Sequence, residues 1–144
     1  MEVNILNFLN SVNPLSEKDC DNLLKIFRTK QLKKGDYWLE EGKINYNVAF
    51  VEEGYLRRYW LKDGIEITDT FYFENDLCVD LPSIVSQTRP LSNVIAMQPA
   101  SLTIFSYAEF NKLCEKSITL EHLNRILVER SLLRFYNIPG FYRA

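Results

Sequence analysis

Residues 31–60 read QLKKGDYWLEEGKINYNVAFVEEGYLRRYW, and they decide the fold class. Glycines at positions 35, 42 and 54 separate short segments that are rich in aromatic and aliphatic residues, and a fourth glycine follows at 64. Turn residues at intervals of about 8–12 residues are typical of antiparallel sandwiches and barrels. We therefore predict strands at residues 37–41, 47–53, 55–61 and 65–73.

The segment Lys62-Asp63-Gly64 is the clearest hairpin signal, because an Asp-Gly pair tolerates the positive φ angles of a tight turn. After this turn, alternate positions of the predicted strand fall on one face, with one polar member: Ile65, Ile67, Asp69, Phe71 and Phe73. Further along, residues 80–86 are predicted as a short helix with Pro82 near its start, and residues 92–97 and 101–105 as two more strands.

Helices are predicted on both sides of these strands. Residues 3–11 and 16–28 have apolar residues at helical spacing, and Ser16 opens the second of these segments with a capping box. Ser106 opens a further helix to about residue 115, and a longer helix is predicted over residues 120–136. The predicted fold class is therefore mainly β with flanking helices.

The composition excludes several classes of protein. The 144 residues suit one domain, and 47% hydrophobic with 25% charged residues is ordinary for a folded globular chain. A net charge of −2 argues against a strongly basic DNA-binding surface. No apolar run reaches the roughly 18 residues that cross a membrane, and the first residues lack the basic region and cleavage site of a signal peptide.

The cysteine and histidine content predicts neither a disulfide nor a metal centre. Cys20, Cys78 and Cys114 are odd in number and far apart, which indicates reduced thiols in a cytoplasmic protein. His122 is the only histidine, whereas a metal-binding barrel enzyme needs two or three histidines and a carboxylate. The same shortage argues against Ser-His-Asp or Cys-His catalysis. We therefore predict no metal and no cofactor.

An apolar stripe marks the last predicted helix. Leu120, Leu123 and Leu127 lie at positions i, i+3 and i+7, and the stripe then becomes mixed, so no long heptad repeat follows. Such a stripe either packs against its own domain or forms a dimer seam of the coiled-coil type. Both interpretations are open, and the second predicts a homodimer through this helix.

The order of these elements resembles the cyclic-nucleotide-binding domain of Crp/Fnr-type transcription regulators over about residues 15–135. The resemblance rests on residues 31–60, on TDTFYFENDLCVDLPSIV at 68–85, on LTIFSYAEF at 102–110, and on the turns Lys34-Gly35-Asp36, Glu41-Gly42 and Glu53-Gly54. It implies one domain over residues 1–144: N-terminal helices at 1–28, an antiparallel β-roll (a double-stranded β-helix, jelly-roll-like) at 29–105, and C-terminal helices, the last of them long, at 106–137.

In that family a phosphate-binding cassette holds the ligand: a Glu binds the ribose hydroxyl, and an Arg, about nine or ten residues later, binds the cyclic phosphate. The resemblance places the Gly-Glu pair at Val79-Asp80 with Leu81 next, and the Arg at Pro90, with Leu91 and Ser92 next and Arg89 one place away. Valine prevents the close approach that glycine permits, and proline has neither charge nor N–H. Two lost charge-assisted bonds, each worth about 1.5–3 kcal/mol, would weaken cyclic AMP binding by roughly two to four orders of magnitude. A one-residue shift would bring Arg89 into place, so binding in a shifted register stays open.

The resemblance implies a regulatory domain without enzyme activity, in which a small-molecule effector near residues 74–92 changes how the last helix packs. Regulators of this type continue into a winged helix-turn-helix domain that this sequence lacks, so we expect no DNA binding by this chain alone, whether it is a stand-alone domain or a truncated regulator. Two alternatives stay open. One is an interaction scaffold with a dead pocket. The other is a metal-free cupin-like enzyme that directs four residues into the barrel: Arg57, Tyr59, Asp69 and Phe71.

Overall fold

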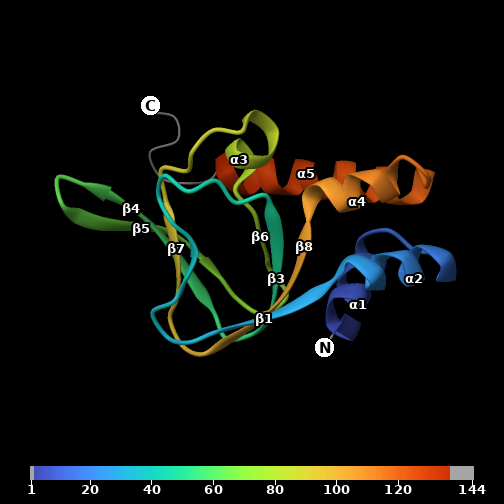
Figure 1. Cartoon of the computed structure of the whole chain (residues 1–144), viewed down its shortest axis with the longest axis horizontal. Coiled ribbons are helices and arrows are strands. Elements are labelled where there is room, and N and C mark those ends of the chain that lie inside the picture. The colour runs from blue at the N-terminus through green and yellow to red at the C-terminus, as the bar shows by residue number, and fades with distance from the viewer. Residues whose placement is uncertain (1, 137–144) are drawn as a thin grey trace.

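The computed structural model describes residues 2–136, and Figure 1 shows a β-roll with helices at both chain ends. The elements of this range, in chain order, are α1 (Glu2–Val12), α2 (Glu17–Ile26), β1 (Arg28–Leu32), β2 (Tyr37–Leu39), β3 (Asn47–Glu53), β4 (Leu56–Lys62), β5 (Ile65–Tyr72), β6 (Leu77–Cys78), α3 (Leu81–Ser86), β7 (Asn93–Ala96), β8 (Ala100–Ser106), α4 (Tyr107–Cys114) and α5 (Ile118–Tyr136). Residue 137, the last of the predicted C-terminal helices, lies outside the described range.

The strands form two four-stranded antiparallel sheets. Their orders are β1-β8-β3-β6 and β2-β7-β4-β5. The interior core takes its buried side chains from both sheets: Leu32, Trp38, Leu39, Ala49, Val51, Leu56, Tyr72, Cys78, Val94, Ala96, Ala100 and Leu102. The two sheets therefore enclose one apolar interior, as a jelly-roll-like β-roll does.

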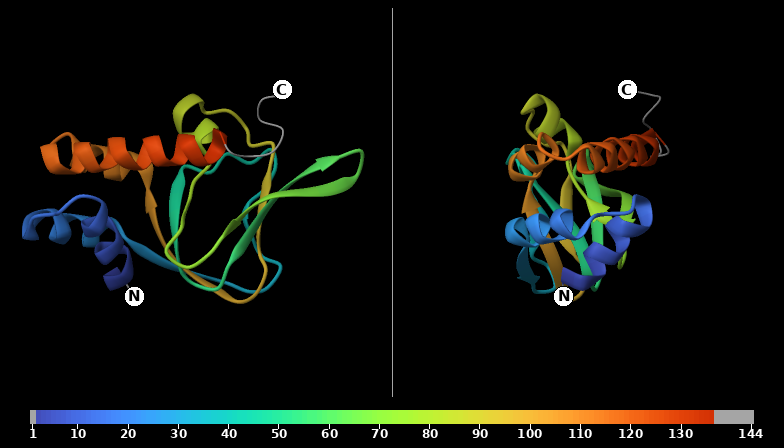
Figure 2. Two further views of the ribbon diagram at one scale, coloured as in Figure 1. Left: turned by 180° about the vertical axis from the view of Figure 1, so that it is seen from behind. Right: turned by 90° about the vertical axis from the view of Figure 1, so that its right-hand side faces the viewer.

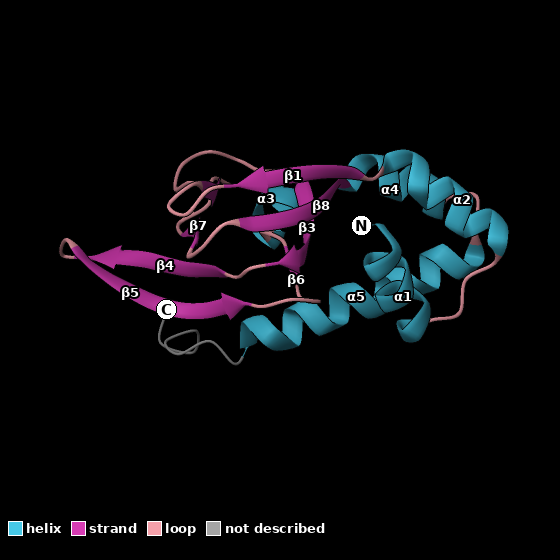
Figure 3. Cartoon of the chain, turned by 90° about the horizontal axis from the view of Figure 1, so that it is seen from below, coloured by secondary structure: helices cyan, strands magenta, loops and turns pink. Residues whose placement is uncertain are grey.

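A second core lies between the first sheet and the helices. Along β3, Ala49 and Val51 belong to the interior core, whereas Val48 and Phe50 belong to the cluster with the helices. Successive residues of a strand point to opposite faces, so β3 is covered on both sides. α1, α2 and α4 lie together at one end of the roll, whereas α3 lies apart from them, as Figures 2 and 3 show. The Phe8 ring of α1 lies 5.5 Å from the Phe50 ring.

The predicted elements are confirmed, with ends shifted by at most two residues, and the fold is the predicted β-roll with flanking helices. Two strands have no signal in the sequence. β1 exposes four of its five residues, and β6 has only two residues, so neither shows an alternating pattern. Pairing with β8 and β3 forms them. Because β1 begins at Arg28, the helix predicted to residue 28 ends at Ile26.

The tight hairpin between β4 and β5 is confirmed. Asp63 and Gly64 have φ angles of 53° and 79°, and Lys62 pairs with Ile65 across the turn. Figure 1 shows this hairpin projecting beyond the rest of the roll.

The predicted common face of β5, with Ile65, Ile67, Asp69, Phe71 and Phe73, is wrong. The register between β4 and β5 shifts between Arg58 and Tyr59, which leaves Asp69 as the extra residue of a β-bulge. Phe71 and Phe73 are exposed, and the Phe73 ring stacks with those of Phe71 and Tyr55. The bulge turns Asp69 instead toward Arg58, which the alternation of a regular strand does not predict.

Serine caps begin two of the helices, as the capping boxes predict. Ser16 accepts a hydrogen bond from the Asp19 backbone N–H at 3.1 Å, and Ser106 accepts one from the Glu109 N–H at 3.3 Å. We expect Ser106→Ala to lower the free energy of unfolding by about 1 kcal/mol, because a first-turn N–H loses its acceptor. Urea denaturation measures this loss. Ser106→Asp keeps a hydrogen-bond acceptor, so its free energy of unfolding should fall less. An equal fall in both variants would contradict the capping role of Ser106.

The apolar stripe of α5 packs against its own domain. Leu120 and Leu123 are 1% and 0% exposed and belong to the core between the helices and β3, and Leu127 packs against that core. This burial is incompatible with a dimer seam made by Leu120 and Leu123. The exposed leucines of α5 are Leu132 and Leu133 instead. Dimerisation through α5 itself stays a prediction.

Within residues 2–136, no helix has both the length and the apolar character that crossing a bilayer requires.

Candidate functional site

A small cleft, with a volume of about 30 Å³, lies where the β-roll, the start of α3 and α5 meet. Figure 1 shows α3 and α5 together at one side of the roll. The cleft is lined by residues of β4, β5, β6, α3, α5 and the segment before α3: Arg58, Tyr72, Leu77, Val79, Asp80, Leu81, Pro82, Ser131 and Arg134. Its walls therefore combine the interior of the roll with the last helix.

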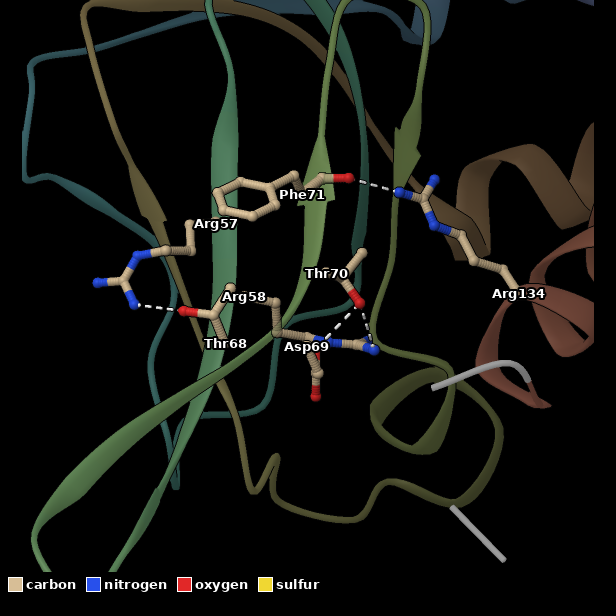
Figure 4. Close-up of polar contacts among 7 residues, drawn as sticks. All are labelled: Arg57, Arg58, Thr68, Asp69, Thr70, Phe71 and Arg134. Carbon is tan, nitrogen blue, oxygen red and sulfur yellow. Dashed lines mark hydrogen bonds and ion pairs between the residues drawn. The ribbon is translucent and has the colours of Figure 1, made fainter. Parts of the chain in front are cut away.

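Arg58, on β4, is the buried charge of this cleft. Its Nε donates to Asp69 Oδ1 at 2.8 Å, and its Nη2 donates to Thr70 Oγ1 at 3.0 Å (Figure 4). The side chains of Arg58 and Asp69 are only 10% and 8% exposed. Burial by itself lowers the pKa of Arg58, but Tyr72 and the hydrogen-bonded Asp69 carboxylate outweigh it and raise that pKa above its ordinary value. The guanidinium therefore stays charged.

Arg134 connects α5 to the edge of the cleft. Its Nη2 donates to the Phe71 carbonyl oxygen at 2.6 Å, as Figure 4 shows, and its Nη1 lies 3.7 Å from Asp76 Oδ1. Its guanidinium also lies 4.6 Å from the centre of the Tyr72 ring. We call these three contacts the Arg134 latch. Because Arg134 is partly exposed, solvent weakens its ion pair, so the latch is a contact that a ligand could exchange.

Asp80 is the N-cap of α3. Its carboxylate accepts hydrogen bonds from the backbone N–H of Ser83, at 3.2 Å, and from the Ser83 hydroxyl. Pro82 fits the first turn because it has no N–H to satisfy, and Gln87 ends the helix in the left-handed region with φ of 53°. The Asp80 carboxylate is therefore engaged by its own helix, and a ribose hydroxyl would compete with that cap.

The second half of the predicted cassette lies away from the cleft. Arg89 Nη1 donates to the Gly42 carbonyl oxygen at 2.7 Å, and the Gly42 N–H donates to the Pro90 carbonyl oxygen at 2.9 Å. Pro90 is buried, Leu91 is exposed, and Ser92 is half-buried. These contacts join the residues that follow α3 to the turn after β2, so the Arg89 guanidinium binds backbone and not the cleft.

The structure thus brings together only part of the predicted site. Val79, Asp80 and Leu81 line the cleft, whereas Arg89, Pro90, Leu91 and Ser92 do not. Four lining residues lie outside the 74–92 segment predicted to hold the effector: Arg58, Tyr72, Ser131 and Arg134. The alternation of side chains along β4 could have indicated Arg58, since Arg58 lies two residues after the buried Leu56 and so faces the same side of the sheet.

The face expected for a cupin-like enzyme is not directed into the barrel. Arg57 lies on the outer face of β4, where it donates to Thr68 Oγ1 at 2.8 Å and pairs with Glu66 Oε1 at 2.8 Å. Phe71 lies opposite Arg57 and is exposed. Tyr59 bonds the exposed Tyr37 through the two hydroxyls at 3.1 Å, which raises the pKa of Tyr59 to about 12. Of these four side chains, that of Asp69 bonds a lining residue of the cleft, Arg58, because of the bulge.

The three cysteines are separate free thiols. Burial raises the pKa of Cys78 to about 12 and that of Cys114 to about 11, and it also raises the pKa of Cys20. A raised pKa leaves little thiolate at neutral pH, so these thiols are poor nucleophiles. Among residues 2–136, no three His, Cys, Asp or Glu side chains are grouped so that they could hold a metal ion.

Comparison of the sequence with protein-family models and with curated protein sequences gives no match. Similar solved structures are found. A cyclic nucleotide-binding domain from Methylobacillus flagellatus is 13% identical with a TM-score of 0.75, and the match covers 92% of this chain and 79% of that one. The Catabolite Activator Protein of Thermus thermophilus is 17% identical with a TM-score of 0.71, covering 87% of this chain and 58% of that one.

A third similar structure is the regulatory subunit of a cAMP-independent protein kinase A from Trypanosoma brucei. It is 17% identical with a TM-score of 0.69, and the match covers 88% of this chain and 46% of that one. The chain therefore spans 58% of the activator and 46% of the kinase subunit. At these identities the likeness concerns the fold. The chain has the cyclic-nucleotide-binding β-roll fold that catabolite-activator-type regulators and protein kinase A regulatory subunits share.

Proposed function

We propose that this chain is a ligand-sensing regulatory domain of a Crp/Fnr-like cytoplasmic transcription regulator, and not an enzyme. One observation carries the proposal: a single cleft is lined both by the cassette-like segment Val79–Pro82 and by Ser131 and Arg134 of α5. An effector in this cleft contacts the roll and the last helix at once. Its binding free energy therefore depends on where α5 lies.

The Arg134 latch supports a switching role for α5. With the latch closed, Arg134 holds α5 to the Phe71 carbonyl and to the Tyr72 ring. An effector that binds the Arg134 guanidinium breaks the contacts of Arg134 with Phe71 and Tyr72. An effector that binds in the cleft without displacing Arg134 strengthens those contacts. Either effector has different affinities for the two positions of α5, which is what a population shift requires. The exposed Leu132 and Leu133 lie on the same helix, so a changed α5 would present a changed surface to a partner copy.

Cyclic AMP in the standard cassette mode is not the effector that this geometry favours. The Asp80 carboxylate caps α3, Arg89 binds the Gly42 carbonyl, and the buried Arg58 and Tyr72 occupy the roll interior beside Asp80. Titration calorimetry is expected to give no saturable heat below about 1 mM cyclic AMP or cyclic GMP, for the wild type and Arg89→Gln alike. Micromolar binding that Arg89→Gln abolishes would instead show a cassette working in a shifted register.

The latch itself is tested on α5. In Arg134→Gln, amide hydrogen exchange in the last turns of α5 should be about 2–10 times faster, because the contacts with Phe71 and Asp76 are lost while the core at Leu120 is kept. The matched control is Arg125→Gln, an exposed arginine of α5 that contacts only its own helix at His122 among the bonds described. Equal exchange in the two variants would contradict the latch.

The effector is sought with a thermal-shift screen of small metabolites, followed by exchange measurements on α5. An effector should bind more weakly to Arg134→Gln and equally well to Arg89→Gln. A ligand that binds in this cleft and leaves the exchange of α5 unchanged would overturn the sensing function.

A second candidate function is the interaction scaffold with a dead pocket. The observation that favours it is the side chain of Tyr72, which is buried in the roll and, together with Arg58, takes up space beside Asp80. A scaffold binds no metabolite in the screen, and its Arg134→Gln variant keeps every partner interaction.

A further inference from the structure

A groove of about 210 Å³ lies between α1, the turn that joins β5 to β6, and the second half of α5. It adjoins the cleft beside Arg58 and shares Leu77, Ser131 and Arg134 with it, but α1 and the β5–β6 turn form walls that the cleft does not have. A water molecule takes up about 30 Å³ in the liquid, so the groove has room for a small molecule of several heavy atoms.

The polar side of this groove carries more positive than negative charge. Arg130 and Arg134 lie four residues apart on α5, which places both guanidinium groups on the same face of the helix. Among the described residues that line the groove, Asp76 is the only carboxylate. Two arginines and one aspartate give this lining a net charge of +1, although the whole chain has a net charge of −2.

The aspartate pairs with one arginine and leaves the other without a counter-charge. Arg134 Nη1 lies 3.7 Å from Asp76 Oδ1, and Asp76 Oδ2 accepts a hydrogen bond from the Phe73 backbone N–H at 2.8 Å. Within residues 2–136, Arg130 makes no hydrogen bond and no ion pair. Like charges four residues apart on a helix repel each other, so both arginines would stabilise an anion between them. A carboxylate suits such a site, because guanidinium groups bind it through charge-assisted hydrogen bonds.

The other side of the groove is apolar. It is formed by Phe8 of α1, Leu77 of β6 and Leu127 of α5. All three side chains are half-buried and pack against the core between the helices and β3. A ligand with a hydrocarbon part would remove the remaining exposed surface of these side chains from water, which favours binding.

We propose that this groove binds a small monocarboxylate with a hydrocarbon part. The carboxylate lies between Arg130 and Arg134, and the hydrocarbon part covers the apolar side of the groove. Inorganic phosphate would satisfy the arginines and leave that apolar side exposed, whereas a neutral hydrocarbon would leave Arg130 without a counter-charge. The site is additional to the cleft beside Arg58, and ligand binding here does not require that the cleft holds an effector.

The test titrates the purified chain near neutral pH and at constant ionic strength, and it follows the backbone amide signals by NMR. Hexanoate and hexanamide have the same carbon chain and differ in charge. Hexanoate should bind at least about tenfold more tightly than hexanamide, because only the carboxylate gains charge-assisted bonds. It should also bind at least about tenfold more tightly than acetate, which has too little hydrocarbon to cover the apolar side. Equal binding of hexanamide would overturn the carboxylate assignment, equal binding of acetate would overturn the role of the apolar side, and shifts that never saturate with hexanoate would overturn the site.

Two matched variants of α5 locate the binding. Arg130→Gln should weaken hexanoate binding at least about tenfold and leave hexanamide binding unchanged. Arg125→Gln replaces an exposed arginine of α5 that lies outside the groove, and it should change hexanoate binding less than about twofold. Equal affinities in the two variants would refute the site. Should Arg130→Gln fail to fold, the wild type decides: hexanoate must shift the signals of Leu77 and Leu127, and shifts confined to other residues would exclude this groove.

Discussion

Replacing Gly54 with alanine is expected to lower the free energy of unfolding by about 2–5 kcal/mol. Gly54 has φ of +85°, a conformation that is strained for any residue with a side chain. A Cβ at this position would lie 2.7 Å from the Pro99 carbonyl oxygen and 2.9 Å from Ala100 Cα. Both are backbone atoms of the segment that leads into β8, so neither can turn aside as a flexible side chain could.

Gly42→Ala is the matched control for this prediction. Gly42 has a similar φ of +84°, but nothing lies within 4 Å of its added Cβ. Gly42→Ala should therefore lower the free energy of unfolding only by the cost of a side chain at this positive φ, about 1–2 kcal/mol. Urea denaturation of the wild type and both variants measures the difference. Equal losses would mean that the Pro99–Ala100 backbone moves away without resistance, and that the close approach at Gly54 does not stabilise the roll.

Removing Asp69 is expected to lower the free energy of unfolding by about 3–5 kcal/mol, because Asp69→Ala takes the carboxylate from a buried guanidinium. Arg58 and Asp69 are joined at 2.8 Å and are both almost fully buried. The desolvation of Arg58 is then no longer offset by its charged neighbour. The loss should be nearly independent of salt, since screening by ions is weak for buried pairs.

The neighbouring arginine provides the control. Arg57 and Glu66 are also joined at 2.8 Å, but on the outer face of the sheet, with Glu66 50% exposed. Glu66→Ala should therefore lower the free energy of unfolding by only about 0–1 kcal/mol. Chemical denaturation at low and high salt compares the two variants. A loss for Asp69→Ala as small as for Glu66→Ala would contradict a stabilising role for the buried pair. A double replacement of Arg58 and Asp69 by apolar residues should recover much of the loss, because no unpaired charge remains.

The predicted part of the candidate site shows which contacts a sequence can reveal. Val79, Asp80 and Leu81 precede or begin a short helix, and the Asp80 cap with Pro82 is a local pattern within four residues. Arg89 belongs to the same stretch of sequence, yet it binds the Gly42 carbonyl, 47 positions away. No pattern near Arg89 contains that partner, so the direction of its side chain could not be predicted.

The Arg58–Asp69 pair is a second contact that could be predicted from the sequence only in part. Side-chain alternation along β4 predicts Arg57 and Arg58 on opposite faces of the sheet. Their different partners, Thr68 and Asp69, confirm this prediction. Which face is the interior depends on β7 and β5, which flank β4. The bulge that turns Asp69 toward Arg58 depends on how β4 and β5 pair, and regular alternation predicts the opposite face.

The sequence by itself determined the Asp63-Gly64 hairpin, the two serine caps, and the succession of the helices and of the strands other than β1 and β6, because each depends on residues only a few positions apart. The tertiary structure alone decided which side chains meet in the cleft, since β4, β5, α3 and α5 contribute to it from positions 58 to 134. It also decided that Leu120 and Leu123 face their own domain, because helical spacing predicts an apolar face but not the segment that packs against it. Burial of Arg58 and the latch at Arg134 have the same cause: they arise from pairing and packing between distant segments.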